Sequence, residues 1–319
     1  MKKLSNNFFF IIGFLAILLF AGTIPATKLV LEIYSPLHVT ALRASCATLF
    51  AIIFFIYLKL KNLQKRDCVS PKNSARFKVN EIYELLVIGL LIVFGFPGAV
   101  AFALAEVSSA YTAVILSMLP LCLSAAAVIM AKEKPPLLFW FYSFAAAALV
   151  GIFMVNEYTM GVSLHRLDIQ KFVLGNFWLF VACICAAVGY TKSASLNKKI
   201  SGFSIISWSL CLTSPISFLL SFLLWPKNLS IQNAIEHSGS LLGIMYLGLL
   251  SMFIGNCLWS IALSRGGIAK IGQIQFLQPF ITIFLSYWLL SELIKKEMIF
   301  FACAVTVVVI LGQRQRFLD

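Results

Sequence analysis

Three polar side chains stand at helical spacing inside a long apolar stretch of the chain. Gln275, Gln278 and Thr282 recur at intervals that place them on one face of a helix. Amides in an apolar environment are costly unless they are hydrogen-bonded, so this face is expected to point into the protein interior. One interpretation is a cavity wall that binds a polar ligand, which Pro279 favours because it interrupts the helix and frees a backbone carbonyl. The other is hydrogen bonding between helices, worth about 1 kcal/mol per bond.

A second group combines aromatic rings with an amide. Tyr246 and Asn256 lie roughly on one helical face of the preceding apolar stretch, with Trp259 beside them, and Tyr190 ends an earlier stretch. Ligand pockets commonly combine aromatic walls with a few polar groups, so these four residues are candidate ligand contacts. Each ring taken singly is equally well explained by ordinary packing or by an aromatic belt at a membrane interface.

Lys28 and Arg43 are the charged residues that fall within the apolar stretches. If these stretches cross a bilayer, a central lysine or arginine costs about 2.5–3.5 kcal/mol on insertion scales. Both side chains are therefore candidate anchors for a carboxylate or phosphate group of a ligand. Two alternatives stay open: the side chains extend to the lipid headgroups, or Lys28 pairs with Glu32 one helical turn later.

Residues suited to other chemistries are absent from the apolar stretches. Asp67, Asp168 and Asp319 fall in loops or at the terminus, and every glutamate lies at the end of a stretch or in a loop. Intramembrane proton relays commonly use carboxylates, so no such relay is expected. The sequence contains no HExxH motif or Gly-rich phosphate loop, and its eight cysteines form no CxxC pair. It therefore predicts no enzyme, no metal site and no cofactor.

The composition identifies the elements that must position these residues. Hydrophobic residues make up 61% of the chain and charged residues 12%, whereas soluble domains carry about 25% charged residues. Backbone groups in lipid must be hydrogen-bonded internally, so each apolar stretch is predicted to be a helix. The first stretch, which follows Lys2 and Lys3, is too long for a signal peptide and is expected to be a span. Ten stretches reach the length that a bilayer of about 30 Å requires: 8–31, 36–58, 82–104, 110–131, 136–155, 172–192, 203–225, 240–263, 268–290 and 297–313.

The basic residues predict the orientation of these spans. With the N-terminus in the cytoplasm, most lysines and arginines fall on the cytoplasmic side. The other side keeps only Arg166, Lys171, Lys227, Lys295 and Lys296. This asymmetry predicts that both termini are cytoplasmic, and it accounts for the net charge of +13 without a nucleic-acid partner.

Two expectations about the surroundings follow. The densest basic segment, the loop at 59–81, is expected to contact anionic lipids. The chain begins without a transit-like extension, which favours the bacterial inner membrane over an organelle.

The chain also contains an internal repeat. Aligned at a constant offset, Pro120 falls on Pro279 and Glu133 falls on Glu292. Because each half holds five predicted spans, an odd number, the second half enters the membrane in the opposite orientation. Inverted repeats of this kind build many secondary transporters, with the substrate site near the midplane.

The same alignment shows that the two halves differ at the candidate site. It aligns the polar face of the ninth stretch with three leucines of the fourth: Leu116, Leu119 and Leu123. One repeat thus offers amides where the other offers leucines. This contrast predicts a two-sided pocket for a solute with a polar end and an apolar body.

Several short motifs resemble those of a known family. The opening of the chain resembles that of the EamA family in the drug/metabolite transporter superfamily: Phe20-Ala21-Gly22, Thr27-Lys28-Leu29, Pro36 and Leu42-Arg43. Two later stretches are similar to its third-to-fourth span signature: Ser108-Ser109-Ala110 through Pro120 to Lys132-Glu133, and Leu263 to Pro279 with Ser291-Glu292. The sequence departs from the family pattern before each closing glutamate, where Lys132 and Ser291 replace glycine.

The resemblance implies an all-α integral membrane protein with ten transmembrane helices as two inverted five-helix repeats, 1–165 and 166–319. It also implies a secondary transporter that moves a small metabolite, an amino acid or amino-acid derivative, by alternating access. The absence of an intramembrane carboxylate favours an exchanger or facilitator. A nucleoside-containing metabolite such as S-adenosylmethionine is the alternative substrate. A membrane channel and a scaffold are the alternatives outside transport.

Overall fold

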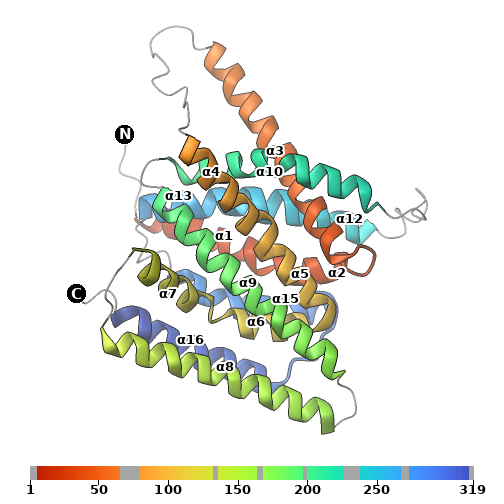
Figure 1. Cartoon of the computed structure of the whole chain (residues 1–319), viewed down its shortest axis with the longest axis vertical. Helices are drawn as coiled ribbons and strands as arrows, with labels where there is room; N and C mark the ends of the chain where they lie inside the picture. The colour runs from red at the N-terminus through yellow and green to blue at the C-terminus, as the bar shows by residue number, and fades with distance from the viewer. Residues whose placement is uncertain are drawn as a thin grey trace.

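The computed structural model describes residues 6–64, 79–131, 136–163, 168–196, 200–225, 238–266 and 273–315. Within these segments every regular element is a helix (Figure 1). The all-α prediction is therefore confirmed for the described residues. Most of the basic loop predicted at 59–81 lies outside them, as do Lys132 and Glu133.

The helices up to residue 163 include several that are interrupted within one apolar stretch. The elements are α1 (Asn6–Ala21), α2 (Thr23–Val30), α3 (Pro36–Gln64), α4 (Val79–Ile88), η1 (Gly89–Gly95), α5 (Phe96–Glu106), α6 (Ser109–Leu116), α7 (Leu119–Ala131) and α8 (Leu137–Ser163). The first span thus breaks at Gly22, and the fourth breaks between α6 and α7. The segment η1 is a π-helix inserted between α4 and α5.

The later helices show comparable interruptions. The elements are α9 (Ile169–Leu196), α10 (Gly202–Leu223), α12 (Ser238–Met245), η2 (Tyr246–Gly255), α13 (Asn256–Gly266), η3 (Gln273–Leu277), α15 (Gln278–Leu290) and α16 (Lys296–Gln315). Here η2 is a π-helix between α12 and α13, and η3 is a 3₁₀ turn that leads into α15.

Eight helical segments are long and apolar enough to cross a membrane. They are Phe8–Val30, Pro36–Ile56, Val79–Glu106, Ser109–Met130, Leu137–Met160, Ile169–Leu196, Gly202–Leu223 and Gly239–Trp259. The last two predicted spans coincide with a shorter apolar helix, Ile274–Leu290, and with α16. The chain is a multi-pass, helical membrane protein.

Helices that are distant in the sequence pack in matching pairs. α3 packs on α10, α6 on α15, and α8 on α16, while α9 lies along α5 as α1 lies along α13. Figure 1 shows α8 and α16 side by side at one edge of the bundle and α3 with α10 near the other. Polar contacts tie α3 to α10: the Ser45 and Ser221 hydroxyl groups lie 3.0 Å apart, and Thr48 donates to the Leu210 carbonyl at 3.3 Å.

Both π-helices begin where the backbone approaches a neighbouring helix closely. A Cβ atom on Gly248 would lie 2.5 Å from Cys46 Cβ and 3.0 Å from the Arg43 carbonyl oxygen of α3. A Cβ atom on Gly89 would lie 2.7 Å from Thr213 Cγ2 of α10. Glycine at both positions therefore permits the α3–η2 and α10–η1 contacts, as small residues commonly do between membrane helices.

Candidate functional site

A pocket lies where two interrupted helices face each other. One interruption separates α6 from α7, and the other is the junction of η3 and α15. The pocket is small, with a cavity volume of about 50 Å³. Interrupted membrane helices are a common way to build a solute site, because they bring polar backbone groups to the interior of the bundle.

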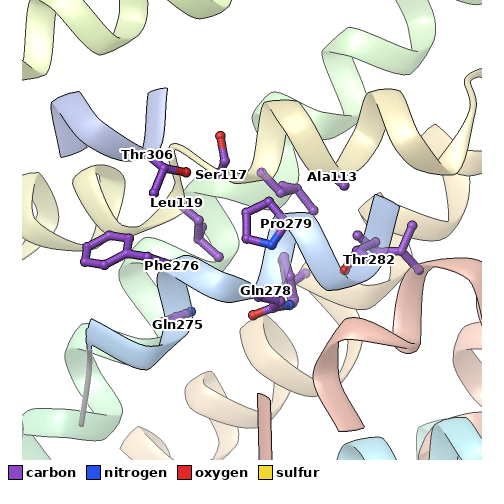
Figure 2. A pocket seen from close by; sticks show the side chains of 12 residues that line it. Ala113, Ser117, Leu119, Gln275, Phe276, Gln278, Pro279, Thr282 and Thr306 are labelled. Carbon is purple, nitrogen blue, oxygen red and sulfur yellow. The ribbon is translucent and has the colours of Figure 1, made fainter. Parts of the chain in front are cut away.

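Two glutamines supply the polar wall of this pocket. Gln275 and Gln278 line it, and their side chains are half-buried. Figure 2 shows them on one side of the α15 ribbon, away from Ser117 and Thr306. Neither amide forms a hydrogen bond with any residue that the structure describes. Their donors and acceptors are therefore available to a ligand.

Three hydroxyl groups also border the pocket, and two of them are already occupied. Thr282 donates to the Ala21 carbonyl at 2.9 Å, and Ser117 donates to the Val114 carbonyl at 2.6 Å. The hydroxyl of Thr306, on α16, has no hydrogen-bond partner among the described residues. Thr306 therefore joins the two glutamines as a group that can bind a solute.

The rest of the pocket wall is apolar. It is formed by Ile24, Phe96, Ala113, Leu116, Leu119 and Phe276. Leu116 and Leu119, the predicted counterparts of Gln275 and Gln278, thus lie in the same pocket as the glutamines. Leu123 packs instead against the neighbouring cluster of Leu119, Cys183 and Ala186.

Pro279 borders the pocket at the first turn of α15. Proline is tolerated there because the first N–H groups of a helix have no intrahelical partner. Its missing N–H nevertheless leaves the carbonyl of Gln275 without the usual i−4 hydrogen bond. The proline therefore marks the change from the 3₁₀ turn to α15.

Three candidate residues lie away from this pocket and support neighbouring helices. The Tyr246 hydroxyl donates to the Leu19 carbonyl at 2.7 Å, close to the break between α1 and α2. Asn256 Nδ2 donates to the Met252 carbonyl at 2.7 Å, where η2 passes into α13. The Trp259 ring packs edge-on against Phe20, with ring centroids 6.4 Å apart.

Lys28 is bound to protein carbonyl groups. Its Nζ donates to the Leu104 carbonyl and, at 3.1 Å, to the Val107 carbonyl. Both carbonyls lie at the C-terminal end of α5, where a positive charge is favourable. Glu106 and Glu292 interact with Lys28 electrostatically. The Lys28 side chain therefore caps the C-terminal end of α5, with two carboxylates in its vicinity.

Arg43 is buried without such a partner. Its side chain, on α3, is 6% exposed, and its Nε atom has no hydrogen-bond partner. Among the described residues, the Tyr190 phenol of α9 lies near the guanidinium. The Tyr190 ring packs edge-on against Phe96, which lines the pocket, with centroids 6.5 Å apart.

Two features of the site were missed by the sequence reasoning. Thr306 is a hydroxyl residue in the middle of the last apolar stretch, a signal comparable to that of the glutamines. The Glu292 carboxylate accepts hydrogen bonds from the backbone N–H groups of Ser109 at 2.9 Å and Ala110 at 3.0 Å. That contact joins residues far apart in the chain, and sequence spacing carries no sign of it.

The helical bundle, with a small pocket between its interrupted helices, defines a polytopic membrane protein. The sequence profile of the EamA-like transporter family matches residues 7–157 and 173–312. The chain therefore belongs to the EamA-like transporter family, as the sequence resemblance predicted, and is a membrane transporter.

Two individual proteins resemble the chain over nearly its full length. A protein of Bacillus subtilis (strain 168), named "Uncharacterized transporter YdeK", is 31% identical over 317 residues, which cover 99% of each chain. A protein of known crystal structure matches 98% of this chain and 99% of its own, with a TM-score of 0.62 and 17% identity. The second likeness supports the fold alone.

Proposed function

We propose that the protein is a secondary transporter that moves a small metabolite, an amino acid or amino-acid derivative, across the membrane by alternating access. The observation that carries this proposal is the pair of half-buried amides, Gln275 and Gln278, which have no partner among the described residues. Unpaired amides in an apolar bundle are unfavourable, and a polar solute in the pocket supplies the missing hydrogen bonds.

The walls of the pocket suit an amphiphilic solute. Gln275, Gln278 and Thr306 offer donors and acceptors, whereas Phe96, Leu116 and Leu119 offer apolar contacts. A side chain or ring of the solute packs against the leucines while its polar end binds the amides. Small amino acids and their derivatives have this two-ended character.

Alternating access requires two related conformations, and two inverted five-helix repeats, 1–165 and 166–319, would provide them. Three observations support this arrangement. The family profile matches the chain twice, a π-helix occurs in both the third and the eighth span, and α3, α6 and α8 pack on their counterparts α10, α15 and α16.

The proposed location is the inner membrane with both termini in the cytoplasm. The distribution of basic residues supports it. So does the arrangement in Figure 1, where α1 begins and α16 ends on the same side of the bundle.

Exchange or facilitated diffusion is the proposed mode of transport. None of the residues that line the pocket is a carboxylate, and carboxylates are the usual carriers of coupled protons. Counterflow in the absence of a pH gradient is therefore expected. A steep dependence of neutral-solute counterflow on an imposed pH gradient would contradict this mode.

The proposal is tested by counterflow in liposomes that contain the purified protein. A panel of labelled amino acids, together with S-adenosylmethionine, is screened first by thermal shift and then by exchange. We expect saturable exchange of at least one compound, and a strong loss of exchange in the Gln275→Leu/Gln278→Leu double variant. The matched control is Gln170→Leu, at an exposed position of α9.

Each alternative has its own outcome in this experiment. Exchange by the double variant at the normal rate would show that the solute does not bind at the two glutamines. Non-saturating currents would indicate a channel, and no exchange of any compound would favour a scaffold. Exchange of S-adenosylmethionine alone would select the nucleoside-containing substrate.

A further inference from the structure

Arg43 lies within the membrane-spanning part of α3. The span runs from Pro36 to Ile56. At about 1.5 Å per residue, Arg43 is about 10 Å from the beginning of the span and about 20 Å from its end. The side chain is 6% exposed, so it is enclosed by protein and does not extend along the lipid surface to the headgroups.

The part of α3 around Arg43 packs closely against two other helices, η2 and α5. A Cβ atom added to Gly248 of η2 would lie only 3.0 Å from the Arg43 carbonyl oxygen. About one turn earlier in α3, the Thr40 side chain lies against Gly98 of α5. The arginine therefore projects from a tightly held segment of α3 into the interior of the bundle.

No group in the described part of the chain neutralises this charge. No carboxylate of a described residue forms an ion pair with Arg43; the ion pair that the described residues do form joins Lys295 to Glu157. Nor does the guanidinium donate a hydrogen bond to a described residue, and its Nε is buried without a partner. A buried charge that lacks a partner is strongly unfavourable, so the missing partner must come from elsewhere.

The contrast with Lys28 shows that the fold can satisfy an intramembrane cation. Lys28 binds two carbonyl groups at the end of α5 and has Glu292 and Glu106 in its electrostatic environment. Arg43 has neither carbonyl acceptors nor carboxylates among the described residues. Lys28 therefore supports the fold, whereas the Arg43 guanidinium has no acceptor among the described residues.

Tyr190 and Phe96 connect Arg43 to the pocket. Tyr190 lies near Arg43 and packs against Phe96. Tyr190 also belongs to the apolar cluster that includes Leu116 and Leu119, which line the pocket. Two neighbouring aromatic rings thus lie between Arg43 and the pocket.

We infer that Arg43 binds the carboxylate group of the transported solute, so that the protein selects monocarboxylates and zwitterions with a free carboxylate. The planar guanidinium forms paired hydrogen bonds with a carboxylate. One unpaired positive charge is neutralised by one negative charge, which favours a carboxylate over a doubly charged phosphate. The inference rests on the proposed transport function and specifies its substrate class.

The first test needs no substrate. The thermal unfolding of ligand-free protein in detergent is compared for the wild type, Arg43→Gln and the control Lys171→Gln, at an exposed position of α9. Because Arg43 has no hydrogen-bond or ion-pair partner among the described residues, Arg43→Gln is expected to unfold at the same temperature as the wild type or higher. A clear decrease, with Lys171→Gln unchanged, would show that the guanidinium is bound within the protein and would overturn the inference.

The second test uses matched pairs of acids and amides. L-Methionine, L-phenylalanine and benzoate are each compared with the corresponding carboxamide, in sulfate and in chloride buffer. At least one acid should raise the unfolding temperature by several degrees at concentrations well above its Kd, while its amide should not. Arg43→Gln should abolish that shift, and Arg43→Lys should retain part of it. Equal shifts from acid and amide, or a shift caused by chloride alone, would refute carboxylate selection.

Counterflow separates this inference from the transport proposal. Arg43→Gln is expected to reduce the exchange of the carboxylate solute about tenfold or more, which corresponds to the loss of a charge-assisted hydrogen bond. If the exchanged solute carries no carboxylate, or if Arg43→Gln exchanges it normally, the inference fails and transport stands. If nothing is exchanged by the wild type, the transport proposal itself fails.

Discussion

Glu292 and Ser109, which are far apart in the sequence, meet at the beginning of α6: the Glu292 carboxylate accepts a hydrogen bond of 2.9 Å from the backbone N–H of Ser109. It accepts a second, of 3.0 Å, from Ala110. The Ser108 side chain accepts a third bond from the Tyr111 N–H at 3.2 Å. The first N–H groups of a helix have no intrahelical partners, and a negative charge there is favourable. Glu292, which follows the end of α15, therefore holds the start of α6 in place.

The first prediction concerns this contact. Glu292→Ala removes two charge-assisted hydrogen bonds and leaves N–H groups unpaired. The free energy of unfolding in detergent should fall by about 2 kcal/mol. Glu292→Gln, which keeps an acceptor but loses the charge, should lie between Glu292→Ala and the wild type. The control is Glu32→Ala, at an exposed position, which should change little. Equal unfolding curves for Glu292→Ala and the wild type would contradict the proposed role.

The second prediction concerns Lys28 of α2, whose ammonium group binds carbonyls at the C-terminal end of α5. Lys28→Gln replaces the ammonium group that donates to the Leu104 and Val107 carbonyls with a shorter, uncharged amide, so the free energy of unfolding should decrease by about 1–2 kcal/mol. Because Lys28 and Glu292 interact electrostatically, the Lys28→Gln/Glu292→Ala double variant should lose less than the sum of the single losses. Full additivity in the double-mutant cycle would show that the two groups act independently.

The third prediction follows from the backbone at Ser291. This residue ends α15 with φ 51° and ψ 29°, in the left-handed region that disfavours residues with a Cβ atom. Glycine commonly occupies such a position at the end of a helix. Ser291→Gly should therefore raise the free energy of unfolding by about 1 kcal/mol, and Ser291→Val should lower it. Thermal unfolding of both variants tests this, and a loss of stability in Ser291→Gly would contradict it.

The class of the protein could be predicted because its signals are local. Apolar stretches of sufficient length indicate membrane helices whatever their packing, and the short motifs around Pro36 and Ser108 indicated the family that the profile match confirmed. The spacing of Gln275 and Gln278 likewise placed them on one face, because helical periodicity depends only on neighbouring residues. Even the departure at Ser291 was visible, although its left-handed conformation was not.

Other features depend on contacts between distant segments. In a largely apolar stretch such as 246–255, the sequence does not distinguish a π-helix from an α-helix, because apolar side chains on every face leave no polar periodicity that would differ between the two. The partners of Lys28 were also beyond prediction: Glu32 is one turn away, yet the acceptors of Lys28 are the carbonyls of Leu104 and Val107. Thr282 likewise has the spacing of a pocket residue, but its hydroxyl bonds to Ala21 of α1. Only tertiary packing decides such cases.

The fourth prediction tests the close approach of α3 and η2. Gly248→Ala places a Cβ atom 2.5 Å from Cys46 Cβ, which forces the helices apart and should reduce the free energy of unfolding by about 1–3 kcal/mol. Cys46→Gly should restore part of that loss in the double variant, whereas Cys46→Ala should not, because it keeps the Cβ atom. Gly151→Ala is the control, since no atom lies within 4 Å of its added Cβ. Full stability of Gly248→Ala would show that the helices separate at no cost.

The fifth prediction separates two threonines that border the same pocket. The Thr306 hydroxyl has no partner among the described residues, whereas Thr282 donates to the Ala21 carbonyl at 2.9 Å. Thr306→Val keeps the side-chain shape, so stability should be unchanged, while solute affinity in counterflow should fall by up to about tenfold, the equivalent of one hydrogen bond. Thr282→Val should instead lower the free energy of unfolding by about 1 kcal/mol, because the Ala21 carbonyl loses its donor. Because the two substitutions are chemically identical, the pair forms its own control. A loss of stability in Thr306→Val with unchanged solute affinity would mean that this hydroxyl serves the fold and does not contact the solute.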